Sequence, residues 1–267
     1  MSQDAYAPAE IAARVETLGV AKARMPFLKT ALLGMLAGAF IGLGALFSTL
    51  VLADASLSFA VQRVAAGICF ALGLFMVVVA GAELFTGNNL LAMAWAARRI
   101  TTAEVLRNWS IVCLANFVGA AGLAVVVYLS GHWHMNGEAV GKTYHAIAAS
   151  KSALPLWEAF WRGVLCNVLV CMAVWMALGG RSVTDRAIAV VPPVAAFVAA
   201  GFEHSIANMY YFPLAWLLSG DLGLSAPALG DMTMNLIVVI LGNLLGGSVL
   251  VALVYWVIYL RDAKRGD

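Results

Sequence analysis

The sequence predicts an all-α membrane protein with six transmembrane helices arranged as two inverted halves. Residues of the AVILMFWYC set make up 63% of the 267 residues, charged residues make up 11%, and the mean hydropathy is +0.91. A soluble domain carries about 25% charged residues, so most of this surface must face lipid. The net charge of +2 is too small to indicate a nucleic-acid partner.

Six apolar stretches are long enough to cross about 30 Å of hydrocarbon. They lie at 30–53, 64–97, 109–130, 157–178, 187–218 and 234–260. The second and the fifth are too long for one simple helix, and polar residues lie inside them: Glu83 is followed by LFTGNN, and Glu203 by HSIAN. We therefore expect both helices to be broken near the middle of the membrane, with each break following its glutamate.

A repeated motif relates the two halves. AGAELFTGNN at 80–89 and AGFEHSIANM at 200–209 share the pattern Ala-Gly-x-Glu-x-x-x-x-Asn, and ANFVGA at 115–120 resembles GNLLGG at 242–247. Each half has three spans, an odd number, so the second half must cross the membrane upside down relative to the first. Paired broken helices in inverted repeats are how many transporters build a site near the midplane.

Basic residues predict the orientation. With the N-terminus in the cytoplasm, twelve basic residues fall inside and four fall outside, namely Arg63, Lys142, Lys151 and Arg162. This bias predicts cytoplasmic termini and location in the cytoplasmic (inner) membrane. Residues 1–27 form a cytoplasmic amphipathic segment without the marks of a signal peptide. Residues 28–262 form the channel domain, and 263–267 a cytoplasmic tail.

Ionisable residues inside a membrane need a partner or a function. Glu83 and Glu203 share one repeat position, which favours support of the two breaks. Each carboxylate would accept hydrogen bonds from backbone N–H groups that the interruption leaves free, and a direct proton relay is the alternative. Asn116 and Asn243 are followed closely by glycine, which favours helix packing.

His204 has Leu84 as its counterpart in the first half, so the imidazole is special to the second break. There it can donate a hydrogen bond to an anion or lend it a proton. Thr86 offers a hydroxyl beside free backbone amides, which suits an anion or a hydrogen-bonding neutral solute. No second His or Cys lies near for a metal site, so we expect no metal and no other cofactor, and no nucleophile motif supports an enzyme.

The basic residues before and within the fourth span allow two interpretations. Lys151 and Arg162 extend to lipid headgroups, or they line a basic vestibule that attracts an anion. Apolar residues near the breaks are equally ambiguous, because they fit either packing or constrictions of a pore. These residues are Phe70, Leu74, Phe85 and Phe197.

These features resemble the formate/nitrite transporter family over roughly residues 28–262. The resemblance is carried by AGAELFTGNN at 80–89, GVLCNVLVCMAVWMA at 163–177 and GFEHSIANM at 201–209. It implies an aquaporin-like fold without sequence relation to aquaporins, a homopentamer with a pore in every protomer, and transport of small monovalent anions. Formate, nitrite and hydrosulfide are the anions that the family moves.

The resemblance also implies roles for individual residues. His204 is similar to the family's central pore histidine, and Thr86 to the threonine of its mobile loop. Phe70 and Phe197 fall at the outer constriction, and Leu74, Leu84 and Phe85 at the inner one. The residues that correspond to the surroundings of the central anion site are Lys151, Asn167 and Asn208.

The choice among anions follows from shorter motifs. Gly-Arg-Ser at 180–182 and VYWVIYLR at 254–261 resemble formate channels most, whereas the Thr-Gly of the 86–87 loop is nearer to nitrite members. We expect a formate channel in which His204 lends a proton to the permeating anion. A nitrite or hydrosulfide channel is the alternative, and a neutral-solute channel or a membrane-embedded enzyme is a weaker one.

Overall fold

The computed structural model describes residues 5–261, which are almost entirely helical; an isolated bridge pairs Ala5 with Gly180. Residues 1–4 of the predicted N-terminal segment and the predicted tail 263–267 lie outside this range. The elements in chain order are α1 (Pro8–Ala23), α2 (Phe27–Leu52), α3 (Phe59–Ala80), α4 (Phe85–Asn88), α5 (Leu91–Ala96), α6 (Thr102–Leu129), η1 (His132–His134), α7 (Ala139–Ser152), α8 (Leu156–Gly179), α9 (Val183–Ala199), α10 (Ser205–Asp221), α11 (Leu229–Leu244), η2 (Leu245–Leu253) and α12 (Val254–Tyr259).

The long helices have the length and composition of membrane spans. Within residues 5–261, five helical segments are long and apolar enough to cross a bilayer: α2, α3, α6, α8 and the continuous 31-residue helix Leu229–Tyr259. Large apolar side chains are exposed on their faces, including Leu114 at 69% and Ile258 at 61%. Lipid is the solvent that accommodates such a surface, and the chain is an all-helical membrane protein.

The predicted fifth span is divided into two pieces. α9 and α10 have 17 residues each, so neither alone reaches the usual length of a transmembrane helix. The second predicted span is divided as well, into α3 and the short helices α4 and α5. Both breaks were therefore expected, but their position differs: α3 ends at Ala80 and α9 at Ala199, so each glutamate lies inside its break rather than before it.

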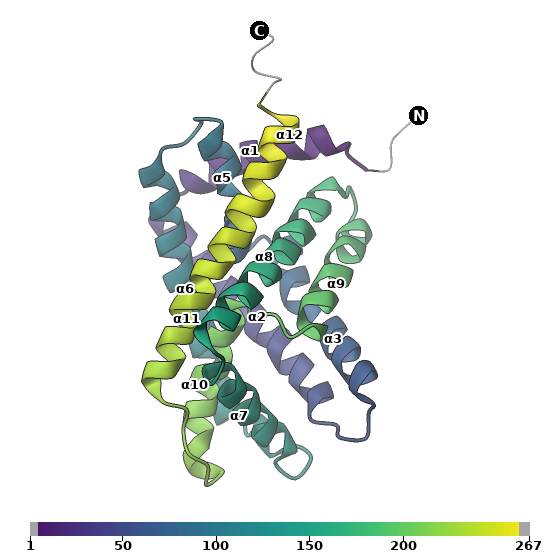
Figure 1. Ribbon diagram of the computed structural model, residues 1–267, viewed down its shortest axis with the longest axis vertical. Coiled ribbons are helices and arrows are strands. Elements are labelled where there is room, and N and C mark those ends of the chain that lie inside the picture. Colours follow the sequence, from purple (N-terminus) through teal and green to yellow (C-terminus); the bar gives the residue numbers. More distant parts are fainter. Residues whose placement is uncertain (1–4, 262–267) are drawn as a thin grey trace.

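Two short helices flank the spans at opposite ends of the molecule. Figure 1 places α1 and α5 with the end of α12 at one end, and α7 with the end of α10 at the other. α1 buries Ile11, Ala12 and Val15 on one face. α7 packs against α10.

Close backbone approaches hold the spans together. α2 packs against α3 and α6, and α8 packs against α9 and α11. At Gly119 of α6 an added Cβ would overlap the carbonyl oxygen of Met35, and at Gly246 it would overlap that of Val164. Small residues permit this approach, which is a common basis of helix packing in membranes.

Candidate functional site

The first break is closed by Asn116 of α6. Gly81 ends α3 in the left-handed conformation, with φ of 83°, and the chain is extended until α4 begins at Phe85. The Asn116 Oδ1 accepts the Phe85 N–H at 2.9 Å, and its Nδ2 donates to the carbonyls of Gly34 and Glu83 at 2.7 and 2.9 Å. One side chain thus satisfies a freed amide and two carbonyls.

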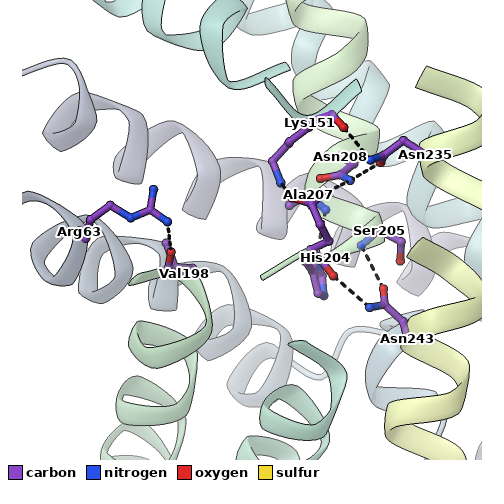
Figure 2. Close-up of polar contacts among 10 residues, drawn as sticks. Arg63, Lys151, Val198, His204, Ser205, Ala207, Asn208, Asn235 and Asn243 are labelled. Carbon is purple, nitrogen blue, oxygen red and sulfur yellow. Dashed lines mark hydrogen bonds and ion pairs between the residues drawn. The ribbon is translucent and has the colours of Figure 1, made fainter. Parts of the chain in front are cut away.

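The second break repeats this arrangement with Asn243 of α11. Gly201 has φ of 74°, and α10 begins at Ser205. The Asn243 Oδ1 accepts the Ser205 N–H at 3.0 Å, and its Nδ2 donates to the carbonyls of Gly163 and Glu203 at 2.8 and 3.1 Å. Figure 2 shows Asn243 facing Ser205. The packing expected of Asn116 and Asn243 is therefore accompanied by a polar contact at each break.

Glu83 is bound by side chains from two elements, α1 and α4. Its Oε1 lies 2.9 Å from Lys22 Nζ of α1, and its Oε2 accepts from Asn88 Nδ2 at 2.7 Å. The Asn88 amide also donates to Asn108 Oδ1 at 3.0 Å, and Asn108 in turn donates to the carbonyl of Lys22 at 3.1 Å. The carboxylate is 4% exposed and fully partnered, as a buried charge requires.

Glu203 has the equivalent partners in the second half. Lys151 Nζ of α7 lies 2.8 Å from its Oε1, and Asn208 Nδ2 donates to its Oε2 at 2.8 Å. Asn235 links Asn208 to the carbonyl of Lys151, as Figure 2 shows. The expectation that backbone amides would donate to the two carboxylates is wrong, because asparagine and lysine side chains take that place.

His204 begins α10 and caps it with its own ring. Nδ1 accepts the Ala207 N–H at 3.2 Å, and Nε2 lies 3.0 Å from the hydroxyl of Thr86. Because Nδ1 is an acceptor here, a neutral ring carries its proton on Nε2 and directs it at Thr86. His204 is 2% exposed and Thr86 is fully buried. The two broken segments therefore meet in one polar contact.

Asn167 of α8 lies next to the Thr86–His204 contact. Its Nδ2 is within hydrogen-bond distance of the Thr86 carbonyl at 3.3 Å, of Asn89 Oδ1 at 2.7 Å and of the Asn243 carbonyl at 2.7 Å. The Oδ1 atoms of Asn167 and Asn208 have no hydrogen-bond partner within residues 5–261. Asn167 thus contacts the backbone of Thr86 and Asn243, Asn208 contacts Glu203 and Asn235, and each amide keeps one acceptor.

Two cavities reach the broken segments: one is lined by His204, and the other by Leu84 and Gly87, which lie close to Thr86 in the chain. The first, named here the Lys151 cavity, has a volume of about 630 Å³ and is lined by Phe70, Phe197, Lys151 and His204, among others. The second, the Lys22 cavity, has a volume of about 340 Å³, and its lining is mainly apolar apart from Lys22, Glu83 and Asn88.

The predicted constriction residues divide between these cavities. The rings of Phe70 and Phe197 meet edge to face, with centroids 5.6 Å apart and an interplanar angle of 80°. The Phe197 ring also stacks on His204 at 5.8 Å. Leu74 and Leu84 line the Lys22 cavity, whereas Phe85 lines neither cavity.

Lys151 and Asn208 were predicted near the anion site, but their contacts with Glu203 were not, and the other partners of the two glutamates were not singled out. Lys22 and Lys151 sit on α1 and α7, which lie outside the apolar spans, and Asn88, Asn108 and Asn235 were not singled out as their partners. The carbonyls of Leu33 and Arg162 accept the N–H groups of Glu83 and Glu203, and Lys22 and Lys151 lie at the same spacing before Leu33 and Arg162. The equivalence of the two lysines is therefore visible only once these contacts are known.

Comparisons with known proteins agree with this geometry. The formate/nitrite transporter family matches residues 9–257. The formate channel FocA of Escherichia coli strain K12 is 40% identical over 278 positions, covering 97% of this chain and 96% of that one. FocA of Haemophilus influenzae is 37% identical and covers 93% of each.

Comparison with solved structures supports the same family. A structure described as a pentameric formate channel with formate bound superposes with a TM-score of 0.80 at 35% identity, covering 88% of this chain and 98% of that one. An ion channel described as a member of the FNT family superposes with a TM-score of 0.84 at 30% identity, covering 93% and 98%. The chain belongs to the formate/nitrite transporter family and is a transport protein rather than an enzyme.

Proposed function

We propose that this protein is a channel for small monovalent anions, with formate as its main substrate. The buried contact between Thr86 and His204 carries the proposal, because it places two polar hydrogens at the junction of the broken helices and beside a cavity. Formate and nitrite are planar oxyanions small enough to meet both groups. The names of the relatives, which are formate channels, favour formate over nitrite.

The proposed path begins in the Lys151 cavity. An anion passes the edge-to-face pair of Phe70 and Phe197 and reaches the Nε2–H of His204 and the hydroxyl of Thr86. It leaves past Leu74 and Leu84 into the Lys22 cavity. A bare anion is costly among such apolar groups, so the two hydrogen-bond donors compensate for part of the lost hydration.

Proton lending by His204 places a condition on the ring. A neutral imidazole with Nδ1 bound to the Ala207 N–H has one proton, on Nε2, and cannot give it away without becoming an anion. Lending therefore starts from the imidazolium, which requires the contact between Nδ1 and Ala207 to open. The imidazolium then gives its Nε2 proton to formate, formic acid forms, and the ring keeps its proton on Nδ1. To restore the neutral tautomer that caps α10, Nδ1 must release this proton and Nε2 must take up another.

We infer two inverted halves with both termini in the cytoplasm. The paired contacts of Asn116 and Asn243, and those of the two glutamate clusters, are what equivalent halves would produce. The excess of basic residues on one side supports the orientation. In the inner membrane the Lys151 cavity therefore faces outward and the Lys22 cavity faces the cytoplasm. The pentameric relative supports a homopentamer.

Side-by-side flux measurements test the substrate. The purified protein in proteoliposomes is expected to carry formate fastest and nitrite and hydrosulfide more slowly, each measured as an initial uptake rate against empty liposomes. Faster nitrite or hydrosulfide uptake would reassign the substrate. Water or ammonia flux without any anion flux would contradict the anion channel.

A further inference from the structure

We infer that Arg63 and Ser48 form an anion-capture site in the Lys151 cavity, above the Phe70–Phe197 pair, for small planar oxyanions such as carboxylates. The inference rests on the proposed function and names the residues that select the substrate before it enters the narrow part of the path. Both residues line that cavity, Ser48 from α2 and Arg63 from α3.

The charges of the cavity point to Arg63. Three of its four cations are paired with carboxylates: Lys151 with Glu203 at 2.8 Å, Arg162 with Glu158 at 2.8 Å and Lys142 with Glu138 at 3.4 Å. Within residues 5–261, Arg63 makes no ion pair. It is therefore the cation whose charge remains available to an entering anion, whereas the charge of Lys151 is already balanced by Glu203.

The guanidinium of Arg63 is held in place by the end of α9. Its Nε donates to the Ala199 carbonyl at 3.0 Å, and its Nη2 donates to the Val198 carbonyl at 2.7 Å. Figure 2 shows the side chain reaching Val198. Of the five N–H groups of an arginine, two are engaged, and the others can bind a carboxylate or nitrite through two parallel hydrogen bonds.

The contact of Arg63 with the end of α9 determines where the site lies relative to the aromatic pair. Val198 directly follows Phe197, so the charge stands beside the aromatic pair. A Cβ at Gly201 would come within 3.2 Å of Arg63 Nη2, so the glycine leaves room for the guanidinium. An anion bound there would be partly desolvated before it passes the two rings.

Ser48 supplies a second donor. Its side chain is 1% exposed, lines the same cavity, and its Oγ has no hydrogen-bond partner within residues 5–261. An unsatisfied buried hydroxyl needs an explanation. A hydrogen bond to an anion held by Arg63 provides one, since no partner from the described part of the chain competes for it.

The equivalent positions of the other half carry no such groups. At the spacing that relates Glu83 to Glu203, Arg63 corresponds to Val183, and His204 to Leu84. At the spacing that relates Lys22 to Lys151, Ser48 corresponds to Ala177. The polar residues without a counterpart thus gather in one cavity, and we expect capture to be stronger from that side than from the Lys22 cavity.

The test compares four variants in proteoliposomes at constant ionic strength. Arg63→Gln should raise the half-saturating formate concentration by about 10-fold with a plateau rate within about 2-fold of wild type, as expected for a lost charged hydrogen bond. Arg63→Lys keeps the charge but cannot form two parallel hydrogen bonds, so its half-saturating formate concentration should lie between those of wild type and Arg63→Gln. Ser48→Ala removes no bond of the protein and should raise the half-saturating concentration by about 2- to 3-fold.

Arg162→Gln is the matched control, because it removes a cation of the same cavity that is paired and exposed. It should leave the half-saturating concentration unchanged. If Arg162→Gln and Arg63→Gln raise the half-saturating formate concentration equally, only net charge matters and the proposed site is wrong. The site is also wrong if Arg63→Gln and Ser48→Ala keep the half-saturating concentration of wild type.

Binding gives a readout independent of flux. Saturation-transfer NMR of the formate proton with detergent-solubilised protein should show transfer in wild type and in Arg162→Gln, and a weaker signal in Arg63→Gln. If wild type carries no anion but this binding pattern is found, the proposed function fails and the site stands. If wild type carries formate and Arg63→Gln binds formate and saturates as wild type does, the capture site is wrong but the proposed function stands.

Discussion

Thr86 Oγ1 and His204 Nε2 lie 3.0 Å apart, although one belongs to the short helix α4 and the other begins α10. Each comes from a helix that is interrupted at an Ala-Gly-x-Glu motif. The interruption frees backbone groups and turns side chains toward the same point. Asn116, Asn243 and the two Lys–Glu pairs keep that point fixed.

Thr86→Val tests the hydroxyl of this contact. Valine keeps the shape but removes the acceptor for the Nε2–H of His204 and the donor for the anion. A buried donor without a partner costs about 1–3 kcal/mol, so we expect formate uptake to fall by about 10-fold. Thr86→Ser keeps the hydroxyl and should stay near wild type in the same uptake assay. Wild-type uptake by the valine variant would exclude Thr86 from the path.

The Lys151–Glu203 pair predicts a rescue in a double variant. Lys151→Met leaves a carboxylate that is 3% exposed without its cation, and breaking such a pair costs roughly 3–5 kcal/mol. Lys151→Met should therefore lower the thermal midpoint in detergent, and Lys151→Met with Glu203→Gln should recover most of it. The side chain of Lys22 is 30% exposed against 16% for Lys151, so Lys22→Met should be milder. Failure of the double variant to recover would show that the lysine has another structural function.

Gly119 and Gly122 form a matched pair on α6. A Cβ at Gly119 would overlap the Met35 carbonyl oxygen, whereas at Gly122 nothing lies within 4 Å. Overpacking against backbone separates α2 from α6 and costs at least about 1–3 kcal/mol. Gly119→Ala should lower the thermal midpoint clearly, and Gly122→Ala should not. Equal midpoints would mean that α2 and α6 can shift apart without loss.

Hydropathy and the repeated motif predicted the spans and both breaks because these features are local in sequence. They also directed attention to His204 and Thr86, whose hydrogen bond joins residues far apart in the chain. The partners of Glu83 and Glu203 could not be read in the same way. Lys22 and Lys151 are brought to them by short helices outside the apolar spans, so their contacts appear only in three dimensions.

Arg63 shows a different limit of the sequence. It was counted only for orientation, because its position in the sequence does not reveal its partners. The contacts separate them, since three have carboxylates nearby and Arg63 has the carbonyls of Val198 and Ala199. Partner geometry, rather than composition, distinguishes a structural cation from one that can bind substrate.

The most direct test of the central claim is the pH dependence of formate uptake in wild type and in His204→Gln. Only an imidazolium has a proton to lend, so wild-type uptake, corrected for empty liposomes, should rise as the pH falls. Glutamine keeps a hydrogen-bond donor but does not titrate, so uptake by the variant should lose this rise. The same pH profile in both proteins would contradict proton lending by His204.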